Sequence, residues 1–421
     1  MLHLTSFAGL FAMIGMAWLM SSDRGRVRWR LVASGMALQF ALAALIFFTP
    51  PGKWLFETLK EVFVQVVACA DGGSAFVFGP EVLKNDSIMN TFAFRALPII
   101  IFFSSLMSLL YYLGVMQWLV RGMAVVMQKT LGTSGAETLS AAANVFVGQT
   151  EAPLVVRPYI ATMTKSELMA MMVGGFATVA GSVLAVYADR FQADAFHLLT
   201  ASVISAPAAL VVAKIMQPET ETPETLGSLK IDAPSEATNA IHAAAMGASD
   251  GAKLAINVAA MLIAFLALIA LADLALGALG NGAARAVNAI FSTDLHADWK
   301  LQEIMGRLFY PLAWLIGVER GDCFEVGKLL GVKMAANEFL AYDQLNQLRQ
   351  ASTLSPRSDM LATYALCGFA NFGSIGIQIG GIGPLAPQRR GDLAQLGLRA
   401  MLGGTLAACM TACVAGVLKY S

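Results

Sequence analysis

Long runs of apolar residues set the strongest limit on what this chain can fold into. A helix needs about 20 apolar residues to cross roughly 30 Å of hydrocarbon. The 421 residues are 57% hydrophobic and only 13% charged, which is too little charge to cover a soluble protein of this length. We therefore expect an all-α polytopic membrane protein with about eight transmembrane helices. The runs that predict these helices are Leu4–Met20, Leu31–Phe48, Leu97–Leu113, Leu168–Ala188, Leu198–Ala213, Leu254–Leu279, Met360–Gly383 and Leu398–Leu418.

Basic residues predict the orientation of these helices, because Lys and Arg collect in short cytoplasmic loops. Four arginines lie between the first two runs, within residues 24–30, and the pair Arg389–Arg390 precedes the last run. Eight crossings with both ends outside the cytoplasm fit these charges. The first run lacks a preceding basic stretch, so we expect it to be retained rather than cleaved as a signal peptide.

The net charge argues against nucleic acid as a partner, and the spacing of the cysteines and histidines argues against a bound metal ion. A formal net charge of +0 leaves no basic face to meet phosphates, so we expect no nucleic acid as a partner. The five cysteines form no C-x-x-C pair and the four histidines show no ligand spacing. The sequence therefore predicts no cofactor and gives little support to a metal-dependent enzyme.

Two stretches are too polar for an ordinary crossing and too apolar for an exposed loop. Residues 140–162 have the polar centre QTE at 149–151, and residues 309–347 contain polar centres at 319–322 and 337–338. Non-helical backbone at membrane depth must be satisfied by protein or by a water-filled cavity. We therefore predict two re-entrant helical hairpins. Interfacial helices are predicted for the amphipathic segments Trp54–Val67 and Gln117–Leu131.

Each predicted hairpin is followed by an apolar run that small and polar residues interrupt. GGFATVAGSV at 174–183 and CGFANFGSI at 367–375 both contain Gly-Phe-Ala followed by Gly-Ser. In the orientation given above, the two runs cross in opposite directions, so the two copies are inverted repeats. Paired, glycine-interrupted segments in inverted halves indicate a transporter binding site near the middle of the membrane.

The predicted domain organisation follows from these segments. N-terminal scaffold spans and an interfacial helix take up residues 1–90. The first half, at 91–214, contains a hairpin at about 135–160 and a broken helix at about 167–188, and a solvated cytoplasmic connector follows at 215–252. The second half, at 253–421, contains a hairpin at about 305–347, a broken helix at about 359–383 and the last span.

Glu151 and Glu338 occupy matching places in the two hairpins. An ionised carboxylate at the centre of a bilayer costs about 2.5–3.5 kcal/mol even on the most lenient scale, so such residues usually mark a functional site. The alternative is that they contact water at the hairpin tips or form structural pairs with Arg157 or Lys333. That alternative weakens because both occur at corresponding positions of a repeat.

The neighbouring polar residues suit a small polar solute. A carboxylate accepts hydrogen bonds from adjacent hydroxyls such as those of a ribose, and Asn371 and Ser374 share one helix face. Gln149 and Thr150 offer a donor and an acceptor together, as a base edge requires. Phe369 can supply an aromatic face or can simply pack in the core. Oxygen atoms alone would hold a cation.

Three other interpretations remain open from these residues. A membrane enzyme could use the two glutamates as an acid–base pair, but we find no nucleophile, metal-ligand set or arginine cluster to accompany them. A gated channel would not need two matched broken helices. Within the transporter class, the polar residues alone do not decide between small polar solutes, of which a free nucleobase is one.

Three motifs resemble the signatures of the concentrative nucleoside transporter family. They are NVFVGQTEAPLVVRPY at 144–159; NEF at 337–339 with AY at 341–342; and GFAN at 368–371 followed by SIGI at 374–377. The motifs occur in the family's order, and the similarity extends over essentially the whole chain.

The resemblance implies a cation-coupled nucleoside symporter of the cell inner membrane, surrounded by lipid bilayer and assembled as a homotrimer. Each protomer would have a scaffold domain and a mobile transport domain that work by alternating access. Sodium is the favoured coupling ion and a proton is the alternative. The family often has Ser where this chain has Thr178, which keeps the hydroxyl but leaves the ion selectivity open.

The resemblance also assigns site residues by their position. The nucleobase would contact Gln149, Thr150 and Val183, with Glu151 nearby through water and Phe369 lining the pocket. The ribose would bind to Glu338, Asn371 and Ser374, and Na+ would bind to Asn144, Val147, Thr178 and Val179.

Overall fold

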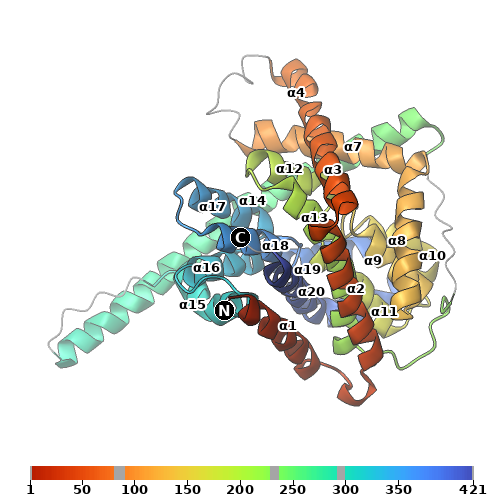
Figure 1. Cartoon of the computed structure of the whole chain (residues 1–421). Helices are drawn as coiled ribbons and strands as arrows, with labels where there is room; N and C mark the ends of the chain where they lie inside the picture. Colours follow the sequence, from red (N-terminus) through yellow and green to blue (C-terminus); the bar gives the residue numbers. More distant parts are fainter. Residues whose placement is uncertain (1, 80–90, 228–236, 292–298, 420–421) are drawn as a thin grey trace.

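The computed structural model describes residues 2–79, 91–227, 237–291 and 299–419, and every regular element in these ranges is helical. The expected all-α class is therefore confirmed. The helices pack around a buried centre, with the long α14 extending beyond the rest (Figure 1). The elements outside the hairpins and broken helices are α1 (Leu2–Leu19), η1 (Arg24–Arg26), α2 (Trp29–Phe48), α3 (Pro50–Ala68), α4 (Ala70–Phe78), η2 (Phe92–Ala96), α7 (Leu97–Tyr112), α8 (Val115–Leu131), α13 (Ala195–Met216), α14 (Ala240–Phe291), α15 (Leu301–Ile316), η4 (Pro387–Arg389) and α20 (Arg390–Leu418).

Eight helical segments in the described ranges are long and apolar enough to cross a membrane. Pro50–Phe78 is one of them, although we expect Trp54–Val67 within it to lie at the interface; that location stays a prediction, as does the interfacial location of α8. The predicted crossing Met360–Gly383 is not among them, because the structure divides it into two short helices. The other seven coincide with predicted runs: Leu2–Leu19, Trp29–Phe48, Ala93–Tyr112, Lys165–Arg190, Ala195–Met216, Ala240–Gly282 and Pro387–Leu418.

The first hairpin begins with α9 (Gly135–Ala143) and returns through η3 (Ala152–Val156) and α10 (Arg157–Ile160), with η3 packed on α9. The broken helix that follows stops at the end of α11 (Lys165–Ala177) and resumes at α12 (Gly181–Arg190). Residues 144–151 and 178–180 therefore lie outside regular helix, and some of their carbonyl groups accept hydrogen bonds from other elements, as Val145 O does from the Ser202 hydroxyl at 2.9 Å.

The second half repeats this order of elements. The hairpin is formed by α16 (Cys323–Ala335) and α17 (Glu338–Gln350), and the broken helix by α18 (Pro356–Leu366) and α19 (Phe372–Ile382). The predicted hairpin at 305–347 is too wide at its start, because α15 is a separate helix that packs on α16. Gly317, with φ +98°, ends α15 in the left-handed conformation that favours glycine.

Small residues allow the central helices to approach closely. α11, α13 and α20 pack on one another; α11 and α13 are largely buried, as is α20 from Ala400 to Gly416. A Cβ added at Gly404 of α20 would lie 2.4 Å from Cβ of Phe176 on α11, and one at Gly403 would lie 3.0 Å from Val173 Cγ2. Glycine at these positions brings the backbones together, as is usual where membrane helices pack.

The pair α7 and α14 forms a second close contact through Gly247 and Gly251. A Cβ at Gly247 would lie 2.5 Å from Ser104 O, and one at Gly251 would lie 2.8 Å from Ile101 Cα. Most of the membrane-crossing part of α14 is exposed in the single chain, including Ile263 at 73% and Leu274 at 73%. These apolar side chains face outward, where lipid or other protein can cover them.

Two capping boxes fix the starts of α9 and α11. In the first, Ser134 and Glu137 exchange hydrogen bonds with each other's backbone amides; in the second, Thr164 and Glu167 do the same. The Ser134 hydroxyl also donates to Glu167 Oε1 at 2.5 Å. The hairpin and the broken helix therefore begin at one shared hydrogen-bonded cluster.

Residues 217–227, called here the connector strap, cover this cluster. Thr225 accepts hydrogen bonds from the amides of Gly135 (2.9 Å, to its carbonyl) and Ala136 (3.0 Å, to its hydroxyl). Glu219 accepts one from the Thr164 hydroxyl at 2.9 Å. We expect a solvated connector at 215–252. Within the strap, residues 220–222, 224, 226 and 227 are exposed, whereas Pro218, Pro223 and Thr225 are buried, and α14 already begins at Ala240. Residues 228–236 of the predicted connector lie outside the described ranges.

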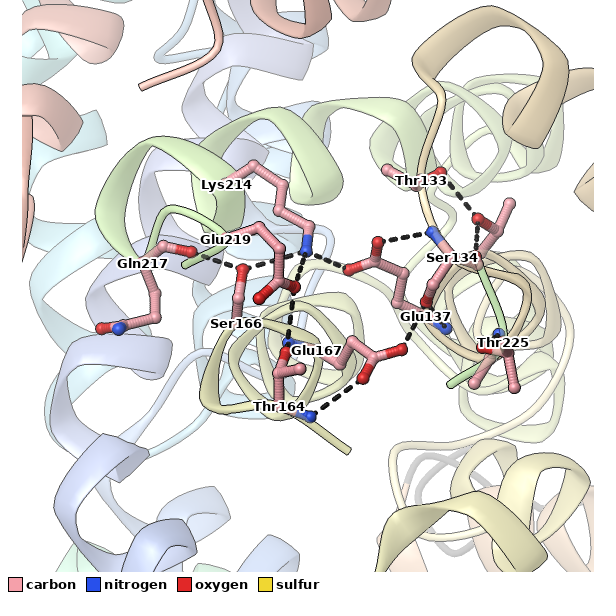
Figure 2. Close-up of polar contacts among 12 residues, drawn as sticks. Thr133, Ser134, Glu137, Thr164, Ser166, Glu167, Lys214, Gln217, Glu219 and Thr225 are labelled. Carbon is pink, nitrogen blue, oxygen red and sulfur yellow. Dashed lines mark hydrogen bonds and ion pairs between the residues drawn. The ribbon is translucent and has the colours of Figure 1, made fainter. Parts of the chain in front are cut away.

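Lys214 lies at the centre of the cluster (Figure 2). Its Nζ is 2.6 Å from Glu137 Oε2 and 3.3 Å from Glu219 Oε2, and it donates to Ser166 Oγ at 2.9 Å. The buried ammonium group thus donates hydrogen bonds to Ser166 and Glu219 and forms an ion pair with Glu137. The ion pairs join α13 and the connector strap to the start of the first hairpin.

Lys214→Met is expected to lower the free energy of unfolding by about 3 kcal/mol, because it leaves two buried carboxylates without their cation. The measurement is the thermal midpoint of the purified protein in detergent. Lys165→Met is the matched control: that side chain is 53% exposed and 3.4 Å from Asp392, and an exposed pair contributes about 1 kcal/mol or less. Equal midpoints for the two variants would contradict a stabilising role for the cluster.

Candidate functional site

The two helix breaks touch each other through their backbones. The amide of Phe369, in the break between α18 and α19, donates to the carbonyl of Thr178, in the break between α11 and α12, at 3.3 Å. Gly368 beside it has φ +145°, and an added Cβ would lie 2.7 Å from Phe176 O. Only glycine permits both this backbone conformation and this approach. Groups on the two breaks are therefore next to each other in space.

Three side chains and one backbone amide form a buried polar group beside the second break. Glu338 is 6% exposed, and its carboxylate accepts hydrogen bonds from the Tyr187 hydroxyl and from Asn371 Nδ2, each at 3.0 Å. Asn371 Oδ1 accepts from the backbone amide of Ser374 at 2.8 Å, and Ser374 is itself buried. The group thus combines the carboxylate of α17, the hydroxyl of α12 and the side-chain amide at the start of α19.

Local helix chemistry places these residues. Asn337 is the N-cap of α17 and accepts from the amide of Leu340 at 2.9 Å, so Glu338 begins the helix. Asn371 is likewise the N-cap of α19. The Glu338 carboxylate therefore lies at the start of α17, where the helix dipole favours negative charge.

The tip of the first hairpin packs against the other half of the site. Gln149 is 7% exposed, and its Oε1 accepts from Gln378 Nε2 on α19 at 3.1 Å. Thr150 lies against Gly381 of the same helix, where an added Cβ would be 2.5 Å from Thr150 Cγ2. Val183 is buried in the first turns of α12, and Phe369 is half-buried in the second break.

Glu151 has a different position from Gln149 and Thr150. It is exposed and lines a cavity of about 510 Å³ between the first hairpin, α7, α12 and α14. Tyr111 of α7 and Asp250 of α14 line the same cavity. The structure therefore does not bring Glu151 into the hydrogen-bonded group around Glu338.

The residues expected to hold a cation lie between the first hairpin and the first break. Asn144 Nδ2 donates to Ser140 O at 3.0 Å, and this backbone acceptor fixes the amide so that Oδ1 points the other way. That buried Oδ1 has no hydrogen-bond partner among the described residues. A cation is one group that satisfies such an oxygen.

Further oxygen atoms that can coordinate a cation lie in the two non-helical stretches beside the Asn144 side chain. An added Cβ at Gly174 would lie 3.2 Å from Asn144 Nδ2, and Thr178 Oγ1 donates to Gly174 O at 2.9 Å, which leaves the hydroxyl lone pairs free. Val147 and Val179 are buried in the same two non-helical stretches. An all-oxygen set of amide, hydroxyl and free carbonyls is suited to Na+.

Two residues of the site escape the motif-based prediction. Tyr187 lies one helical turn after Val183, and Gln378 lies one turn after Ser374, each on the face of a predicted residue. A polar Gln within the apolar run IGIQIGGI is a visible signal, but its partners come from distant elements.

Family models cover most of the chain. The model described as "Na+ dependent nucleoside transporter C-terminus" matches residues 197–416, and the corresponding N-terminus model matches residues 8–81. A third, "Nucleoside recognition", matches residues 93–193.

Curated relatives and solved structures agree with these matches. "Solute carrier family 28 member 3" of Mus musculus is 44% identical, and the alignment covers 99% of this chain and 59% of that longer protein. An "Uncharacterized transporter" of Haemophilus influenzae is 45% identical, with coverage of 98% and 97%. "Sodium/nucleoside cotransporter 1" of Rattus norvegicus is 42% identical, with coverage of 99% and 64%.

Among solved structures, CNTnw in an inward-facing substrate-bound state is 43% identical over 99% of this chain and 98% of that chain, with a TM-score of 0.88. A variant of CNTnw in an outward-facing state gives a TM-score of 0.87 at 43% identity, with coverage of 99% and 98%. The likeness is thus of similar strength for two opposite states of one transporter. The chain belongs to the Na+ dependent nucleoside transporter family.

Proposed function

We propose that the protein is a secondary active transporter that carries nucleosides into the cell together with a cation, Na+ being favoured. The observation that carries this proposal is the buried group formed by Glu338, Asn371 and Ser374 at a helix break. Burying a carboxylate in a membrane protein is costly, so its retention beside an unwound helix favours a binding role. The rat relative is named a sodium/nucleoside cotransporter.

The ribose would bind at the second break. Ribose hydroxyls can donate to the Glu338 carboxylate and exchange hydrogen bonds with Asn371 and Ser374. The Tyr187 hydroxyl and the Asn371 amide donate to this carboxylate at 3.0 Å each. These two contacts hold the carboxylate in one orientation, and holding a binding group in place lowers the cost of binding.

The base would lie toward the tip of the first hairpin. Gln149 and Thr150 supply hydrogen-bonding groups there, and Val183 and Phe369 supply apolar and aromatic surface. Glu151 would act at longer range, since it lines the cavity on the side of α7 and α14. This cavity is large enough for a nucleoside and would form part of its path.

Na+ would bind to Asn144 Oδ1, the Thr178 hydroxyl and carbonyls of the Val147 and Val179 region. The hydrogen bond from Phe369 N to Thr178 O provides a physical route for coupling. A cation that fixes the backbone conformation of the first break would also fix that of the second break, where the substrate would bind. Such coupling must be reciprocal between the two ligands.

The mobile part would be the two hairpins with the two broken helices, and α7 with α14 would belong to the scaffold. Movement of the hairpins and broken helices against the scaffold would give alternating access. The exposed apolar side chains of α14 suit contact with lipid and with other copies in a homotrimer. The proposed location is the inner (plasma) membrane.

The test is uptake of radiolabelled uridine into proteoliposomes under two gradients. With Na+ outside, we expect accumulation above equilibrium; with K+ outside and an inward proton gradient, we expect none. Accumulation only with protons would keep the substrate and overturn the ion. Failure of both uridine and adenosine to accumulate under either gradient would contradict nucleoside transport.

A further inference from the structure

Gln378 connects three separate elements of the site. It lies on α19, is 1% exposed, and places Nε2 3.1 Å from Gln149 Oε1 and 3.1 Å from the carbonyl oxygen of Met172. Met172 belongs to α11 and Gln149 to the tip of the first hairpin. One side-chain amide therefore joins the hairpin to both broken helices.

The backbone carbonyl of Met172 sets the direction of this chain of hydrogen bonds. A carbonyl oxygen can only accept, so the Gln378 amide must turn its NH2 group toward it. The same NH2 group faces Gln149, so Gln149 must present its oxygen in return. The Gln149 amide is thereby fixed with Oε1 occupied and Nε2 directed elsewhere.

Gly175 of α11 lies directly against the side-chain amides of Gln378 and Gln149, with no room for a larger residue. A Cβ added at Gly175 of α11 would lie 2.8 Å from Gln378 Nε2 and 2.9 Å from Gln149 Cβ. Any larger residue at 175 would displace the pair. Gln378 Oε1 is itself buried without a partner among the described residues, so the side chain is held by its two donor contacts.

We infer that Gln378 is a positioning residue for substrate recognition, which orients Gln149 as a hydrogen-bond donor toward the base. The inference rests on the proposed function. It selects nucleosides whose base offers an acceptor, either a carbonyl oxygen or an unprotonated ring nitrogen. A base analogue without acceptors gains nothing from Gln149 in this orientation.

Gln378→Met tests this role, because Met has a similar volume but no amide. We compare the Kd of uridine with that of a phenyl C-riboside, which carries ribose and an aromatic ring but no base acceptor. The variant should bind uridine about ten-fold more weakly, the loss of one oriented hydrogen bond, and the phenyl riboside with less than a two-fold change. The half-saturating Na+ concentration and the maximal uptake rate should also stay within about two-fold.

Further variants separate orientation from structure. In a Gln149→Leu background, adding Gln378→Met should change the Kd of uridine by less than about two-fold, because Gln378 acts only through Gln149. Gly175→Ala should reduce uridine binding selectively without removing either amide. Gln347→Met, an exposed glutamine that donates to Asp343 on α17, is the matched control and should bind both ligands as the wild type does.

Equal weakening of both ligands in Gln378→Met, or full additivity with Gln149→Leu, would show a structural role and overturn the inference. Wild-type affinity for uridine in Gln378→Met would also overturn it while leaving nucleoside transport intact. If the wild type binds neither uridine nor adenosine, both the inference and the proposed function fall together.

Discussion

Glu338→Gln is expected to lower the efficiency of uridine uptake (Vmax/KM) by about a thousand-fold. In the proposed site, the carboxylate would accept hydrogen bonds from both hydroxyls of a ribose, and the substitution replaces it by an amide that can accept at only one atom. Two hydrogen bonds to a charged group contribute about 1.5–3 kcal/mol each, and about 4 kcal/mol corresponds to a factor of a thousand. The measurement is the initial rate of radiolabelled uridine uptake over a range of concentrations.

The control for this variant lies on the same hairpin. Glu325→Gln removes a carboxylate whose side chain is 32% exposed and which pairs with Lys328 at 3.2 Å, away from the second helix break. Its uptake should stay within about two-fold of the wild type. The ribose-binding role of Glu338 is untenable if the two variants take up uridine equally well, provided that both have wild-type thermal midpoints.

Asn144→Ala is expected to raise the Na+ concentration for half-maximal uptake by about fifty-fold. The buried Oδ1 of Asn144 has no hydrogen-bond partner among the described residues, and losing one oriented oxygen from a cation is comparable to losing a charged hydrogen bond, about 1.5–3 kcal/mol. Uridine uptake measured against Na+ concentration gives this value. By linkage, the affinity for uridine at fixed Na+ should fall as well.

A second buried amide supplies the control for sodium. Asn346 on α17 also has an Oδ1 without a partner among the described residues, yet it belongs to the far arm of the second hairpin. Asn346→Ala should leave the Na+ dependence within about two-fold of the wild type. An unchanged Na+ dependence in Asn144→Ala would exclude the proposed ion site.

Much of the fold can be predicted from local patterns. The apolar runs give most of the membrane-crossing helices, because their length and composition are decided within each segment. The two helix breaks are visible in the sequence as GGFATVAGSV and CGFANFGSI, because small and polar residues within an apolar run favour an interrupted helix. The caps Asn337 and Asn371 are of the kind that begins a helix, and the structure uses them so.

The relations between distant elements cannot be predicted in this way. Tyr187 and Gln378 contribute to the site because α12 and α19 reach the second hairpin and the tip of the first, and no local pattern contains those distances. The boundary between α15 and the second hairpin depends on Gly317 adopting a left-handed conformation. Likewise, the connector strap looks solvated by composition, but Thr225 accepts hydrogen bonds from two amides at the start of α9, and Glu219 accepts one from the Thr164 hydroxyl at the start of α11.

Calorimetric binding of uridine to the purified protein, with and without Na+, tests whether the proposed ion site and substrate site are coupled. We expect saturating Na+ to tighten uridine binding at least ten-fold, and saturating uridine to tighten Na+ binding by the same factor. Asn144→Ala should remove this coupling while weak uridine binding remains. Identical uridine affinity in Na+ and in K+ would contradict coupled transport, because the two helix breaks would then bind their ligands independently.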